Sequence, residues 1–145
     1  MINNRNNEMK KKITFYVNDL LINGFSYIEK DYPEADFVMD KDFDYTKLIN
    51  SIKKKKPNYN TVLVFDSNFK INNNQYKELI NILKDNKVYI IIVNNSNVKL
   101  DNVTIIDFYT EIEKNPDYMM VDNIHLTDKG NKELNKLLNK KIEIK

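Results

Sequence analysis

Short apolar runs recur along the chain and alternate with amphipathic stretches. Five runs have the length and the β-branched or aromatic composition typical of strands. The strongest, KVYIIIV, is apolar at almost every position, which indicates a strand buried on both faces and therefore a sheet covered by helices on both sides. The predicted strands are 12–17, 35–39, 61–65, 87–93 and 103–106.

Apolar residues return at helical spacing between and after these runs. Alternating strands and helices give a parallel sheet with right-handed crossover connections. The predicted fold class is therefore α/β: a three-layer α/β/α domain with a five-stranded parallel sheet in flavodoxin-like order. The spacing predicts helices over 19–30, 45–53, 74–83 and 126–138.

The ends of the chain differ from this pattern. Residues 1–11 are polar and Asn-rich, which indicates a disordered tether or a cloning remnant, and we expect residues 12–145 to form a single domain. No apolar run approaches the length of about 18 residues that a membrane span needs, so no direct membrane insertion is predicted. The first residues also lack the apolar segment of a signal peptide.

Composition excludes several classes of function. Hydrophobic residues make up 41% and charged residues 30%, which is globular rather than disordered composition. The absence of cysteine excludes disulfides, thiolate metal sites and cysteine nucleophiles. Arg5 is the only arginine among 23 basic residues and the net charge is +2, so we expect no nucleic-acid partner. The basic run Lys53–Lys56 is interpreted as the solvated end of a helix.

Ligands of open parallel sheets bind beyond the carboxyl ends of the strands, so the residues that follow each strand are candidates for chemistry. His125, the only histidine, stands in such a position, just before the last predicted helix, with Asp122 three residues earlier. A lone histidine is more often structural. Here, however, a carboxylate at this spacing can accept an imidazole N–H and stabilise the imidazolium, and Thr127 is a suitable N-cap for the helix that follows.

The stretch VDNIHLTDKGNKELNKLL resembles the last conserved block of the SGNH (GDSL-type) hydrolases, in which a D-x-x-H-L-T-x-x-G pattern supplies Asp and His of a Ser-His-Asp triad. The chain is most similar to the extracellular SGNH domains fused to membrane-bound O-acyltransferases of the peptidoglycan O-acetyltransferase type. The resemblance extends over about residues 12–138. It implies the SGNH-hydrolase fold, and it implies catalytic roles for Asp122 and His125.

The chain departs from that family at the nucleophile and at the oxyanion hole. Asp19 stands where the resemblance places the serine nucleophile, and the family's two oxyanion-hole glycines fall near Asp42 and at Asp66. The asparagine of the third block is retained as Asn68. Carboxylates at such positions oppose the negative charge that an oxyanion hole must stabilise. Ser67, next to Asn68, is the one candidate for a displaced nucleophile.

Two hypotheses for function follow. The first is a degenerate SGNH-like domain that serves as an accessory or binding module for a cell-surface glycan or an acyltransferase membrane domain, with little or no esterase activity. The alternative is an active esterase or O-acyltransferase acting on cell-wall glycan through Ser67 or through a water activated by His125. The location would be extracellular for part of a membrane acyltransferase and cytoplasmic for an independent chain.

The carboxylates after the first three strands also allow a divalent-cation site. Asp19, Asp42 and Asp66 with His125 nearby would offer the hard oxygen ligands that Mg²⁺ or Ca²⁺ prefers. Aspartates at these places also cap helix N-termini, and this interpretation is favoured. We therefore predict no metal and no cofactor.

Overall fold

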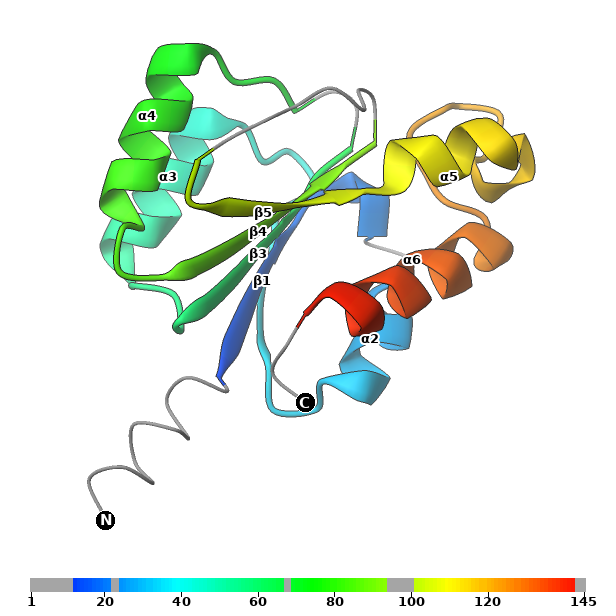
Figure 1. The fold of residues 1–145 in the computed structure, drawn as a ribbon, viewed down its shortest axis with the longest axis horizontal. Coiled ribbons are helices and arrows are strands. Elements are labelled where there is room, and N and C mark those ends of the chain that lie inside the picture. Colours follow the sequence, from blue (N-terminus) through cyan, green and yellow to red (C-terminus); the bar gives the residue numbers. More distant parts are fainter. Residues whose placement is uncertain (1–11, 22–23, 67–68, 94–100, 143–145) are drawn as a thin grey trace.

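The computed structural model describes residues 12–21, 24–66, 69–93 and 101–142, and these form an α/β/α sandwich (Figure 1). All pairings in the five-stranded sheet are parallel, and the order is β2-β1-β3-β4-β5. The predicted α/β class and flavodoxin-like order are confirmed. The strands are β1 (Ile13–Val17), β2 (Asp36–Met39), β3 (Asn60–Val64), β4 (Lys87–Ile92) and β5 (Val103–Asp107).

Helices cover both faces of this sheet. One face carries α3 (Tyr45–Lys54) and α4 (Asn73–Ile82), drawn in cyan-green and green in Figure 1. The other face carries α2 (Phe25–Asp31), α5 (Phe108–Lys114) and α6 (Asp128–Lys141). Two short 3₁₀ turns, η1 (Asp19–Leu21) and η2 (Pro116–Tyr118), complete the order of elements.

Two apolar cores, one on each face, hold the layers together. Along β1, Phe15 and Val17 face the core under α2 and α6, whereas Tyr16 faces the core under α3 and α4. All three are at most 1% exposed. A large apolar side chain buried in this way contributes roughly 1.5–3 kcal/mol relative to an exposed one. The two-sided burial explains why the strands are apolar at nearly every position.

Side-chain caps fix where several helices begin. Asp44 Oδ1 accepts the N–H of Lys47 at 2.9 Å at the start of α3, and Asn72 forms a capping box with Gln75 at the start of α4. Thr127 Oγ1 accepts the N–H of Gly130 at 3.1 Å, which makes Thr127 the N-cap of α6 as predicted. Each such cap satisfies a backbone donor that the helix itself leaves unpaired.

The structure differs from the predicted helices in three places. The helix predicted over 19–30 is divided into η1 and α2, and Gly24 lies before α2 where a β-carbon would meet the Asn131 side chain at 2.2 Å. The last helix begins at Asp128 rather than residue 126, because Thr127 is its cap. The helix α5 and the turn η2 were not predicted, since each is too short to show a helical period.

Candidate active site

A tight loop before α6 builds the pair of Asp122 and His125. The loop is closed by a backbone hydrogen bond in which Met120 donates its N–H to the carbonyl of His125 at 2.8 Å. Asn123 has a φ of 59°, in the left-handed region that asparagine tolerates better than most residues. This turn brings the side chain at position 122 back towards the histidine that follows it.

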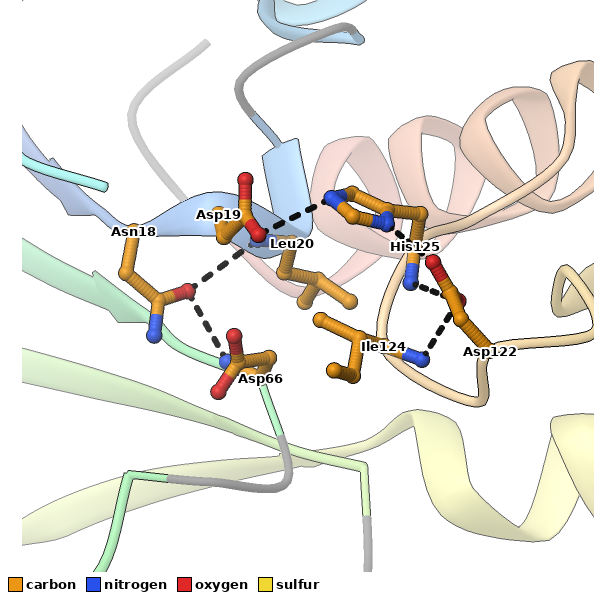
Figure 2. Close-up of polar contacts among 7 residues, drawn as sticks. All are labelled: Asn18, Asp19, Leu20, Asp66, Asp122, Ile124 and His125. Carbon is orange, nitrogen blue, oxygen red and sulfur yellow. Dashed lines mark hydrogen bonds and ion pairs between the residues drawn. The ribbon is translucent and has the colours of Figure 1, made fainter. Parts of the chain in front are cut away.

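Asp122 makes three contacts within this loop. Its Oδ1 accepts the backbone N–H groups of Ile124 at 2.9 Å and His125 at 3.0 Å (Figure 2). Its Oδ2 lies 2.5 Å from Nδ1 of the His125 ring. The contact expected from the three-residue spacing is therefore present. One carboxylate both shapes the loop and orients the imidazole.

Asp19 reaches the other side of the same ring from the end of β1. Its Oδ2 lies 3.0 Å from Nε2 of His125, as Figure 2 shows. The Asp19 side chain is 15% exposed and the His125 side chain 24% exposed, so the contact is partly shielded from water. The structure thus brings together three of the predicted site residues, Asp19, Asp122 and His125.

Asn18 fixes the turn that carries Asp19. The Asn18 side chain is buried, and its Oδ1 accepts the backbone N–H of Leu20 at 3.2 Å and of Asp66 at 2.9 Å. These bonds tie the end of β1 to the end of β3 (Figure 2). The sequence prediction did not assign Asn18 a role. The signal available in the sequence was a polar residue at the end of a buried strand, directly before a candidate site residue.

The two carboxylates favour protonation of the ring. The hydrogen bond to Asp122, and next the one to Asp19, raise the pKa of His125 above its usual 6.5. The pKa of Asp122 is lowered to about 2, mainly by the backbone N–H of His125 and then by the imidazole and the N–H of Ile124. Both contacts favour the imidazolium, in which each of the two ring N–H groups can donate to a carboxylate.

The cation site that the sequence allowed, without favouring it, receives no support from the described residues. Along the described residues, no group of three or more histidine or carboxylate side chains is placed to hold a metal ion. Asp42 is exposed and its backbone N–H donates to Asp40 Oδ1 at 2.8 Å, whereas Asp66 is buried at 6% exposure. These two carboxylates and Asp19 therefore have different surroundings.

Two predicted site residues, Ser67 and Asn68, lie outside the described residues, so their roles remain predictions. Over the ranges that the structure covers, no helix is both long enough and apolar enough to cross a bilayer.

Comparisons with known proteins bear on the fold. No protein-family model matches the chain, and the search of curated proteins found no match. A solved structure does match, with a TM-score of 0.64 and 12% sequence identity, over 89% of this chain and 90% of that chain. In fold, this chain is similar to that structure, the C-terminal catalytic domain of Streptococcus pneumoniae peptidoglycan O-acetyltransferase A (OatA) with a methylsulfonyl adduct.

Proposed function

We propose that the chain is an SGNH-hydrolase-like domain of a cell-surface O-acyltransferase system in which serine-dependent catalysis has been lost. In this role it is an accessory or binding module for a cell-surface glycan or for the membrane part of an acyltransferase. One observation carries the proposal: the carboxylate of Asp19 lies 3.0 Å from Nε2 of His125, where a hydrolase of this kind needs a serine hydroxyl.

The replacement reverses the direction of the key hydrogen bond. In a Ser-His-Asp site, Nε2 accepts the proton of the serine hydroxyl and thereby activates it. A carboxylate has no proton to give, so Asp19 accepts the N–H of His125 instead. Asp19 is also a weak nucleophile towards esters, and its attack would give a mixed anhydride. Loss of the nucleophile from such a unit lowers the rate by several orders of magnitude.

A water activated by His125 is a less suitable route. A general base needs an unprotonated nitrogen within reach of the water. Here Nδ1 contacts Asp122 and Nε2 contacts Asp19, and both contacts favour the protonated ring. The arrangement therefore favours binding over ester hydrolysis.

The assignment to an O-acyltransferase system rests on two further observations. The match to the OatA catalytic domain covers nearly the whole of both chains. The Asp122–His125 pair follows the motif on which the family resemblance is based, and its side chains are in contact. A cell-surface location and a single domain over residues 12–145 belong to the same proposal.

Two assays with the purified chain test this function. Hydrolysis of 4-nitrophenyl acetate should be no faster for the wild type than for His125→Ala. Co-sedimentation with insoluble peptidoglycan, O-acetylated or chemically de-O-acetylated, should show binding. Ester turnover by the wild type that is lost on Ser67→Ala would establish the displaced nucleophile and overturn the proposal.

A further inference from the structure

A cavity of about 450 Å³ is lined in part by Tyr16 and Val38, which belong to the core on the α3 side of the sheet. It opens between the edge strand β2 and the C-terminal end of α3, with Val38 and Pro57 among its apolar lining. Its volume is within the range of about 300–1,000 Å³ that is usual for small-molecule sites. The cavity shares no lining residue with the Asp19–His125–Asp122 cluster.

The topology of the sheet creates this space. Tyr16 on β1 and Val38 on β2 are register partners, so both side chains lie on the α3 side of the sheet. Since β2 is an edge strand and α3 ends at Lys54, Val38 is only half-buried, whereas Tyr16 is 1% exposed. After α3 the backbone becomes extended at Lys55 and leads to Pro57. An apolar surface is thus left beside the end of a helix.

Two polar residues that line the cavity, Thr14 and Asp36, already accept hydrogen bonds from Asn58. Asn58 donates its backbone N–H to Thr14 Oγ1 at 2.9 Å and its side-chain N–H to Asp36 Oδ2 at 3.1 Å. Asp36 is the one carboxylate among the residues that line the cavity. The lining thus holds one carboxylate, which already accepts a hydrogen bond from Asn58.

Three lysines supply the positive charge of the lining. Lys54, Lys55 and Lys56 all line the cavity and are all exposed. The C-terminus of a helix carries about half a negative elementary charge, which is small against three ammonium groups. Lysines at the mouth of an apolar cavity suit an anion held by charge rather than by bidentate hydrogen bonds. The run Lys53–Lys56 is exposed at the end of α3, as its interpretation as a solvated helix end expects, and three of its lysines also line this cavity.

We propose that this cavity binds an amphiphilic anion, a small molecule with an apolar body and a carboxylate or phosphate head. The body lies against Val38 and Pro57, and the head lies among Lys54, Lys55 and Lys56. The proposal is independent of the function assigned to the His125 site, because it uses other residues on the other face of the sheet.

Titration calorimetry with decyl phosphate and with decanoate, each below its micellar concentration, tests the proposal. Both should bind at least about tenfold more tightly than the uncharged decyl maltoside, because three charge pairs each contribute about two- to fivefold. For the same reason, the triple variant Lys54→Gln/Lys55→Gln/Lys56→Gln should lose about tenfold or more in affinity. The triple variant Lys132→Gln/Lys136→Gln/Lys140→Gln, with the same charge change on α6, should bind like the wild type.

A variant whose side chain fills the cavity provides a second test of the proposal. Val38→Phe should abolish binding of decyl phosphate while circular dichroism shows a folded protein, and Ser51→Met, which adds bulk from α3, is the substitute if Val38→Phe does not fold. Equal affinity for decyl maltoside, or equal loss in the two lysine variants, would overturn the proposal. Binding only to phosphatidylglycerol vesicles, and to neither soluble anion, would indicate membrane attachment and would also overturn it.

Discussion

Asp19 at the end of the first strand and His125 before the last helix form an ion pair with a separation of 3.0 Å. The pair joins two segments that lie far apart in the sequence, and it is completed on the far side of the ring by Asp122 at 2.5 Å. A protonated histidine between two carboxylates forms a charged cluster, and the pKa of His125 can be measured directly.

The first prediction concerns the pKa of His125, measured by NMR titration of the imidazole. The value should lie above the usual 6.5, because hydrogen bonds to Asp122 and Asp19 favour the imidazolium. Asp122→Asn should lower the pKa more than Asp19→Asn does, because Asp122 has the larger effect. Asp117→Asn, which removes a carboxylate paired with Lys129 instead, should leave the value unchanged. A wild-type pKa at or below 6.5 would contradict the charged cluster.

The second prediction concerns stability against pH. The raised pKa of His125 means that its contribution is complete below about 6.5 and is lost as the pH rises through the folded-state value. The lowered pKa of Asp122 means that its contribution is complete above 3.8 and is lost as the pH falls through about 2. The wild type should therefore exceed His125→Gln in free energy of unfolding most clearly at about pH 4–6.

Urea denaturation of both proteins at about pH 5 and about pH 9 checks this prediction. The difference between them should be smaller at the higher pH. The difference in free energy of unfolding between the wild type and Asp19→Asn should also be smaller at the higher pH. It should be smaller than the difference for His125→Gln, because Asp19→Asn removes only one of the two carboxylate contacts of the ring. A difference that grows with pH would show that the ring is neutral in the folded protein.

The third prediction concerns recovery of ester hydrolysis. Asp19→Ser alone should give little activity towards 4-nitrophenyl acetate, because Asp42 and Asp66, at the proposed oxyanion-hole positions, would still oppose an oxyanion. Asp19→Ser combined with Asp42→Gly and Asp66→Gly should give measurable activity. Glycine at position 66 keeps the backbone N–H that Asn18 accepts, so the end of β1 stays tied to β3. The same triple variant with His125→Ala is the control and should be inactive.

The fourth prediction concerns the packing of α6. A β-carbon at Gly130 would lie 2.1 Å from the backbone carbonyl oxygen of Tyr118, which also accepts the N–H of Thr127 at 2.9 Å. Gly130→Ala should lower the free energy of unfolding by about 1–3 kcal/mol or more. Gly24→Ala should cost less, because the atoms that it meets belong to the side chain of Asn131, which can rotate. Urea denaturation measures the loss in free energy of unfolding for both variants. Equal losses would show that the backbone at Tyr118 shifts as easily as the Asn131 side chain rotates.

Much of the fold could be predicted because burial on both faces leaves a clear pattern in the sequence. Every residue of β1 and of β3 is buried, and both strands were predicted to within one residue at each end. The helix α5 left no such pattern, since it follows β5 directly and has only seven residues. Gly24, which precedes α2, lies where a β-carbon would meet the side chain of Asn131, a residue remote in sequence.

The candidate site was predictable to the extent that its contacts are local or lie at strand ends. The spacing of Asp122 and His125 predicts their contact, and the position of Asp19 after a buried strand predicts its place at the same edge. The sequence marked Asn18 only as a polar residue at a strand end; its bond to Asp66 was not predictable, because Asp66 becomes a neighbour only through the pairing of β1 with β3. The cavity beside β2 arises from the place where α3 stops relative to the sheet, which no local pattern records.

The two contacts of the His125 ring come from two separate segments of the chain. Asp122 is anchored by backbone groups of its own loop, and its contact with Nδ1 needs nothing from the first strand. The group facing Nε2 arrives on a separate segment, at residue 19. A single substitution at residue 19 exchanges the group that faces Nε2, while Asp122 stays in place at Nδ1. The group that faces Nε2 can therefore change while the loop and its Asp122–His125 contact are retained.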